Sequence, residues 1–146
     1  MNLVFSSKVA KDARPALEEL FFFNPRQHRV REGIVHSLGT FGHPRIEETP
    51  GGLSVRVGDQ EAQTLFVFDQ DRRGGNPIGI VVFIRTSPTD IAIAHVAVHP
   101  DYALQGRHAG QGLGLVLIEK VKEIAARIVG VRRIVLHYRQ EIAIRI

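Results

Sequence analysis

The chain has 146 residues, of which 44% are hydrophobic, 23% charged and 7% aromatic, and its formal net charge is +4. These are ordinary values for a globular protein, so we expect one domain over residues 1–146 and exclude a mainly disordered chain. The absence of cysteine excludes disulfides, thiolate metal sites and cysteine nucleophiles. No apolar run reaches the roughly 18 residues of a membrane span, and no basic and apolar leader opens the chain. We therefore expect a cytoplasmic protein.

Arginine accounts for 15 of the 19 basic residues. A guanidinium binds phosphates and carboxylates through two parallel hydrogen bonds, so this excess fits an anionic ligand. A bias in genomic base composition explains it equally well. Basic residues are interspersed with acidic ones, and there is no long basic run, so a nucleic-acid partner is not indicated.

The N-terminal third predicts a strand followed by two helices. Residues 3–5 form a short apolar segment, and Asp12 with Pro15 is typical of a helix start. Asn24-Pro25 ends this helix, and apolar residues spaced four apart predict a second helix over residues 25–38. Residues 42–52 are rich in Gly and Pro and predict a loop.

The middle of the chain predicts an antiparallel meander. Short segments rich in Val, Ile and Phe are separated by turns of Gly, Pro, Asp and Asn. The predicted strands are residues 53–57, 65–68, 78–84 and 91–98. Residues 78–84 are almost continuously apolar, which favours a central strand buried on both faces.

A glycine-rich segment and an amphipathic helix follow the meander. Gly110, Gly112 and Gly114 precede a helix whose apolar stripe comprises Leu113, Leu117, Val121, Ile124 and Ile128, and Gly130 ends it. Residues 132–138 then predict a strand parallel to the one at 91–98, joined to it by this crossover helix. The fold class is therefore mixed α/β (α+β): an antiparallel meander with one parallel crossover.

A glycine-rich turn before a helix is an anion site, because free N–H groups and the helix dipole point at the ligand. Gly114-Leu115-Val116 lacks the Lys-Ser/Thr of a Walker loop. The G-x-G-x-G spacing and the long connection after Val98 do not match a dinucleotide fingerprint either.

The segment Val96-Ala97-Val98-His99-Pro100-Asp101-Tyr102, followed by Gly110-Gln111-Gly112-Leu113-Gly114, resembles the GNAT superfamily of acyl-coenzyme A-dependent N-acyltransferases. The similarity extends over residues 77–138, and the N-terminal strand and two helices also agree with the family's order. Two registers of its Q/R-x-x-G-x-G/A motif remain open: one uses Gly112-Leu113-Gly114, and the other uses residues 107–112.

The resemblance implies that acetyl-CoA binds in a gap between the strand at 91–98 and the strand at 132–138. The pantetheine arm would pair with the backbone of Val96, Ala97 and Val98. The pyrophosphate would contact the loop, for which the candidate residues are Arg107, His108, Ala109, Gly110, Gln111, Gly112, Leu113 and Gly114. The acceptor amine would enter from the opposite side.

Direct acetyl transfer needs a base for the ammonium proton and an acid for the departing thiolate. His95 is the candidate base and Tyr138 the candidate acid, although either side chain is also compatible with a hydrogen-bonded role in the sheet. On a strand, residues four apart lie about 13 Å apart. His95 and His99 therefore cannot share one ion, and we expect no metal.

The family's last helix and hairpin have no counterpart, and residues 140–143 resemble the start of that helix. We expect this ending to leave a sheet edge exposed, with a partner copy covering it and residues 141–146 adding to a neighbouring sheet, which makes a homodimer. The expected function is acetyl transfer from acetyl-CoA to a primary amine of a small molecule or protein. The alternative is a catalytically silent module that binds acyl-CoA and regulates a partner protein.

Overall fold

The computed structural model describes residues 2–22, 44–58, 60–72, 74–102, 112–136 and 142–145. A six-stranded sheet has the strand order β1-β5-β6-β7-β8-β9, and a second, three-stranded sheet has the order β2-β3-β4. The large sheet consists of β1 (Leu3–Ser6), β5 (Gln63–Asp69), β6 (Gly79–Arg85), β7 (Asp90–Val98), β8 (Arg133–Leu136) and β9 (Ile142–Arg145). The small sheet consists of β2 (Pro44–Thr49), β3 (Gly52–Val57) and β4 (Gln60–Glu61).

Two helices and two short 3₁₀ turns complete the described structure. The turn η1 (Lys11–Ala13) leads directly into α1 (Arg14–Phe22), η3 (Pro100–Tyr102) follows β7, and α3 (Leu113–Ala126) connects β7 to β8. The pattern of Asp12 and Pro15 predicts an N-cap at Asp12, but Asp12 lies inside η1, whose N-cap is Ala10, so this prediction was wrong. No described helix has the length and apolar character needed to cross a membrane.

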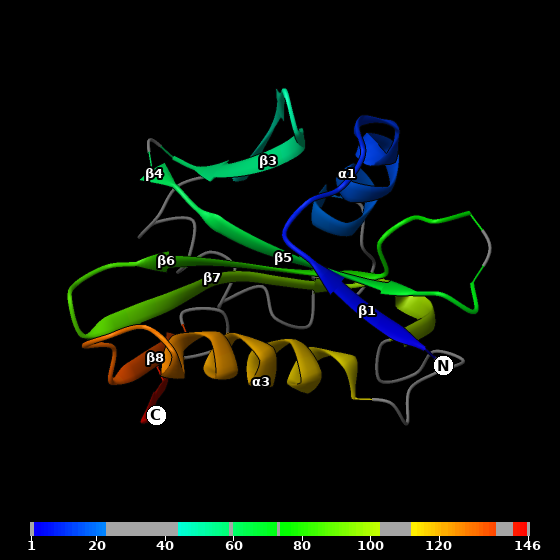
Figure 1. The fold of residues 1–146 in the computed structure, drawn as a ribbon. Helices are drawn as coiled ribbons and strands as arrows, with labels where there is room; N and C mark the ends of the chain where they lie inside the picture. The colour runs from blue at the N-terminus through cyan, green and yellow to red at the C-terminus, as the bar shows by residue number, and fades with distance from the viewer. Residues whose placement is uncertain are drawn as a thin grey trace.

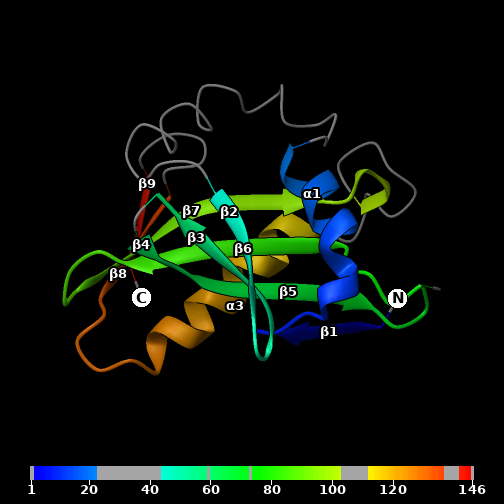
Figure 2. The same ribbon diagram turned by 90° about the horizontal axis from the view of Figure 1, so that it is seen from above.

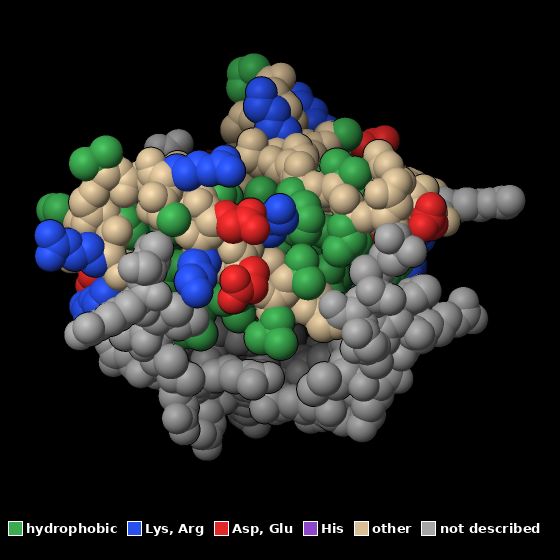
Figure 3. Space-filling model, turned by 60° about the horizontal axis from the view of Figure 1, so that its bottom comes forward, with side chains coloured by type: hydrophobic (Ala, Val, Ile, Leu, Met, Phe, Trp, Pro, Cys, Tyr) green, Lys and Arg blue, Asp and Glu red, His purple; other side chains and the backbone are tan. Residues whose placement is uncertain are grey.

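The molecule has three layers (Figure 1). The helix α3 covers one face of the large sheet, while α1 and the small sheet cover the other. Figure 2 shows α1 and the β2–β3 hairpin lying over the strands, with α3 beneath them. Figure 3 shows charged side chains of both signs in the middle of the α3 side of the molecule, with hydrophobic side chains beside them. On α3, Lys120 Nζ lies 3.2 Å from Oε2 of Glu123.

Each face of the large sheet has its own hydrophobic core. Alternate residues of β6 enter the two cores: Ile80 and Val82 pack on the α1 side, and Val81 and Phe83 on the α3 side. Both sets are at most 6% exposed, which confirms the prediction of a central strand buried on both faces. The apolar stripe of α3 is also confirmed at Leu113, Leu117 and Val121, although the helix ends at Ala126, before Ile128.

The predicted loop at residues 42–52 is wrong in its greater part. Residues 44–49 form β2, which pairs with β3 in an antiparallel hairpin from Pro44↔Val57 to Thr49↔Gly52. Among the side chains of β2 whose burial is described, Ile46 is the one buried hydrophobic residue, so the sequence of this strand carries too little alternation to indicate a strand. Gly52 has a φ of +132°, and a Cβ there would lie 2.2 Å from the carbonyl oxygen of Val9. A glycine is therefore needed where the hairpin meets the segment before α1.

The segment at 142–145 corrects a second expectation. Instead of opening a helix, it forms β9 and pairs antiparallel with β8, from Arg133↔Arg145 to Leu136↔Ile142. This segment therefore extends the chain's own sheet. The predicted second helix at 25–38 lies outside the described residues.

Candidate functional site

The strand β7 lies between β6 and β8 in the large sheet. Ile91 to Ile93 and His95 to Val98 pair with β6, and Asp90 to Ile93 pair in parallel with β8. The described part of β8 ends at Leu136, the partner of Ile93. A strand backbone of this kind can bind an extended ligand when one of its edges is accessible.

A β-bulge interrupts the pairing of β6 with β7. Val82 of β6 pairs with His95, whereas the next residue, Phe83, pairs with Ile93. Ala94 is the extra residue, so β7 bends here and the alternation of its side chains shifts by one position. Bulges of this kind re-aim a side chain.

The bulge decides the direction of His95. Directly paired residues share a face of a sheet, and Val82 belongs to the core on the α1 side. His95 therefore points to the α1 side, opposite to Val96, which belongs to the core beneath α3. The His95 side chain is 6% exposed. This candidate base thus lies on the face of the sheet opposite α3.

The N-terminus of α3 lies at the same end of the sheet as the second half of β7 (Figure 1). Gly112 precedes the helix with φ +58° and ψ +45°, a left-handed conformation that favours glycine. The first helical hydrogen bond runs from the Val116 N–H to the Gly112 carbonyl at 3.0 Å. The N–H groups of Leu113, Gly114 and Leu115 thus precede any carbonyl acceptor within the helix, the arrangement that binds anions.

Gly112 and Gly114 differ in their surroundings from Gly79, which is closely packed. A Cβ built on Gly112 or Gly114 would meet nothing within 4 Å. By contrast, a Cβ on Gly79 would lie 2.9 Å from Val67 and 3.3 Å from Leu117, so Gly79 serves helix–sheet packing. Packing among the described residues therefore does not explain Gly112 and Gly114.

His99 lies just beyond β7, on the continuation of that strand. Its backbone N–H donates to the Ile78 carbonyl at 2.7 Å, and the Asp101 N–H donates to its Nδ1 at 3.1 Å. Burial, together with the nearby Arg72 guanidinium, lowers the pKa of His99, against the opposing effects of Asp101 and Glu19. His99 is therefore neutral over a wider pH range than an ordinary histidine.

The predicted site residues fall into two groups. Val96, Ala97, Val98, Gly112, Leu113 and Gly114 are described, and they belong to the two elements just discussed. Residues 107–111 and the candidate acid Tyr138 lie outside the described residues. Sequence reasoning missed Asp69 and Arg72, which contact the segment after β7, because nothing in the sequence of a turn reveals a partner some 30 residues away. Within the described ranges, no three His, Asp or Glu side chains are grouped as metal ligands.

A family model described as "Acetyltransferase (GNAT) family" matches residues 40–145, which is more than half of the chain. The chain belongs to the GNAT acetyltransferase family. The predicted resemblance and fold class are therefore confirmed. No curated protein sequence gives a significant match.

Solved structures of GNAT proteins share the fold. The N-acetylglutamate synthase from Neisseria gonorrhoeae, solved with coenzyme A and N-acetyl-glutamate, is 17% identical with a TM-score of 0.51, over 93% of this chain and 25% of that one. The loading GNATL domain of CurA from Lyngbya majuscula is 17% identical with a TM-score of 0.50, over 93% of this chain and 64% of that one.

An IAA acetyltransferase from Bacillus cereus is 21% identical with a TM-score of 0.49, and the match covers 92% of this chain. The chain spans 65% of the length of that protein.

Proposed function

We propose that this GNAT chain transfers an acetyl group from acetyl-CoA to a primary amine of a small molecule or protein. The observation that carries the proposal is the position of the α3 N-terminus, whose first N–H groups precede any acceptor within the helix, at the same end of the sheet as the second half of β7. An extended amide-bearing arm suits the strand, and a diphosphate suits the helix N-terminus. Acetyl-CoA carries both groups in one molecule.

In this proposal, the β7 backbone at Val96, Ala97 and Val98 binds the pantetheine arm, and Gly112, Leu113 and Gly114 bind the pyrophosphate. The remaining loop candidates at 107–111 keep the same proposed role. Because Gly112 holds the left-handed conformation and Gly114 has free space beside it, the register with Gly112-Leu113-Gly114 as the G-x-G is favoured.

The proposed reaction is a direct transfer. The amine nitrogen attacks the thioester carbonyl carbon, a C–N bond forms, and the C–S bond breaks to release the thiol of coenzyme A. His95 accepts the proton that the ammonium group loses, directly or through water, and Tyr138 protonates the departing thiolate. The α1-side direction of His95 supports this role, because the amine then approaches from the face opposite α3.

The test is coenzyme binding followed by turnover. Acetyl-CoA is expected to raise the melting temperature of the protein, and at least one amine in a panel of polyamines, amino acids, arylalkylamines and peptide N-termini is expected to release free thiol. Binding without thiol release from any amine would favour the alternative of a silent acyl-CoA-binding regulator. No binding at all would overturn both.

Three further expectations remain proposals. We propose that residues 1–146 act as one GNAT domain, that the protein is cytoplasmic, and that it forms a homodimer. Since residues 142–145 pair within their own sheet, β9 is the edge strand offered to a second copy. Sedimentation at micromolar concentration tests the dimer, and a monomer would contradict it.

A further inference from the structure

Five side chains connect the turn after β5 to the segment after β7. They are Asp69, Arg72, His99, Asp101 and Tyr102, and we call them the turn clamp. Both segments lie at the right-hand end of the sheet in Figure 1, where α3 begins. None of the five has a role in the reaction proposed above.

The inner part of the clamp is a buried hydrogen bond. The Tyr102 hydroxyl donates to the Asp69 carboxylate at 2.6 Å, and the two residues are 2% and 7% exposed. Asp69 also accepts from the backbone N–H groups of Asp71 at 3.0 Å and Asn2 at 3.2 Å. The Tyr102 hydroxyl is the largest cause of a lowered Asp69 pKa. Because a buried carboxylate without donors is strongly disfavoured, these contacts specify one position for Tyr102.

The outer part of the clamp is centred on Arg72. One of its Nη atoms donates to Asp101 at 3.0 Å, and the other lies 3.3 Å from Nε2 of His99. The guanidinium also lies over the Tyr102 ring, 5.8 Å from its centroid. Arg72 therefore holds the exposed side of η3 while Asp69 holds the buried side.

Tyr102 connects the clamp to the start of α3. Its ring belongs to the core beneath α3, which also contains Leu113, the first residue of the helix, and Val96 of β7. The clamp thus connects the turn after β5 to the end of β7 and to the hydrophobic core that contains the first residue of α3. The end of β7 and the start of α3 are the two elements that the proposed function assigns to coenzyme A.

We propose that Tyr102 and Asp69 are positioning residues for coenzyme A, which hold the end of β7 and the N-terminus of α3 at the separation that the coenzyme requires. This inference rests on the proposed function. Its physical basis is preorganisation: backbone donors recognise a diphosphate well only when they are already placed, and ordering them on binding reduces affinity.

The chain offers a matched control. Asp90 is also a carboxylate at the end of a strand with a pKa lowered chiefly by a side-chain donor, Arg133, but it lies at the other end of β7. Tyr102→Phe keeps the ring and removes the hydroxyl. We expect it to weaken coenzyme A binding about tenfold, the effect of one lost hydrogen bond to a charged group. Asp90→Asn is expected to leave the dissociation constant within about twofold, because distant sites contribute independently.

The measurement is titration calorimetry with coenzyme A at a temperature where all variants are folded. If Asp69→Asn or Tyr102→Phe fails to fold, Arg72→Ala replaces them, since its side chain is 35% exposed, with an expected loss of about threefold. In turnover assays, KM for acetyl-CoA is expected to rise while kcat at saturating coenzyme is retained.

Two outcomes separate this inference from the proposed function. Wild-type protein that does not bind coenzyme A would overturn the proposed function itself. Wild-type binding with an unchanged dissociation constant in Tyr102→Phe, or an equal loss in Asp90→Asn, would overturn only the positioning role.

Discussion

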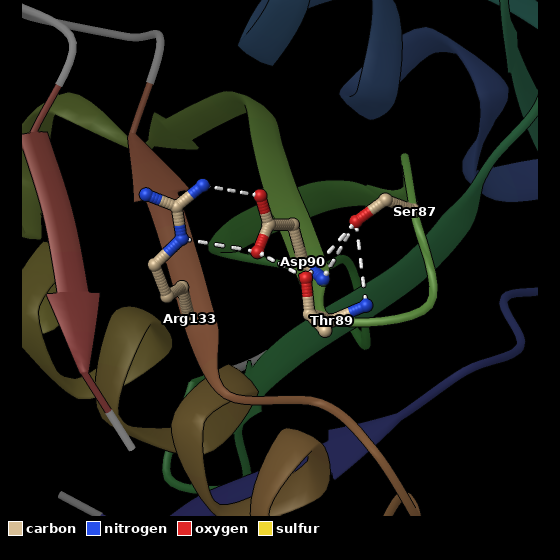
Figure 4. Close-up of polar contacts among 4 residues, drawn as sticks. All are labelled: Ser87, Thr89, Asp90 and Arg133. Atoms are coloured by element: carbon tan, nitrogen blue, oxygen red, sulfur yellow. Dashed lines mark hydrogen bonds and ion pairs between the residues drawn. The ribbon is translucent and has the colours of Figure 1, made fainter.

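The two ends of β7 use the same chemistry for different purposes. At the first end, Arg133 donates to both carboxylate oxygens of Asp90, from Nε at 3.1 Å and from Nη2 at 2.5 Å (Figure 4). Ser87 closes the turn beside it by accepting the Asp90 N–H at 3.1 Å. At the other end, the carboxylate of Asp69 accepts the Tyr102 hydroxyl in the core. Each carboxylate joins a strand end to a segment distant in the sequence.

The two ends differ in what surrounds them. At the first end, Asp90 to Ile93 pair with β8, and the Asp90–Arg133 contact joins a hairpin to this parallel strand. At the second end, Tyr102 shares a hydrophobic core with Leu113, the first residue of α3. Changes at the first end should therefore affect stability, and changes at the second end should affect coenzyme binding and turnover.

The largest expected effect is at the helix N-terminus. Gly112→Asp places a carboxylate where the pyrophosphate is expected. At an effective dielectric constant of 20, like charges about 4 Å apart repel by roughly 4 kcal/mol, so coenzyme A affinity should fall about 1,000-fold. Titration calorimetry measures this loss.

Gly75→Asp is the control for that substitution, because Gly75 also has a positive φ (+66°) and free space beside it. The control should bind coenzyme A normally. Unchanged affinity in Gly112→Asp would show that the diphosphate binds elsewhere and would remove the functional difference between the two ends.

The second largest effect is expected at His95, next to the β-bulge in the middle of β7. Replacing a general base lowers kcat about 100-fold or more, so His95→Gln should reduce turnover by this amount while acetyl-CoA still binds. Steady-state kinetics at saturating substrates, with circular dichroism to establish folding, measure the change. An undiminished kcat would assign the proton transfer to another group.

A smaller effect is expected at the first end. Arg133→Ala removes both hydrogen bonds to Asp90, and because Arg133 is 49% exposed the melting temperature should fall only by about 2 °C. Coenzyme affinity should not change. A loss of affinity in this variant would mean that the two ends of β7 are coupled, contrary to the comparison above.

The smallest effect is a pH dependence at the second end. The pKa of His99 is lowered in the folded protein by burial and Arg72, while Asp101 and Glu19 oppose the shift. The unfolded chain, with a histidine pKa of about 6.5, therefore binds protons more readily, and stability falls as the pH drops below about 6.5. In His99→Gln, this loss should be smaller. Urea denaturation at several pH values measures it, and parallel curves for the two proteins would contradict the expectation.

Much of the fold was predictable because its signals are local. The apolar run at 78–84, the strand at 91–98 and the stripe of α3 each show a periodicity that identifies one kind of element. The hairpin strand at 44–49 was missed because a strand packed mainly through Ile46 shows little alternation. The part of the candidate site that the sequence predicted is the set of glycines before α3. The contact between Asp69 and Tyr102 could not be predicted, since their 33-residue separation leaves no local pattern.

The sequence by itself determined which segments are strands and helices, which glycines precede α3, and that a histidine lies within β7. Only the tertiary structure decided where that histidine points. A single extra residue in a strand reverses every later side chain, and the bulge at Ala94 sets His95 on the face of Val82. This outcome depends on the register between two strands, a property of pairs of segments that neither strand's own sequence contains.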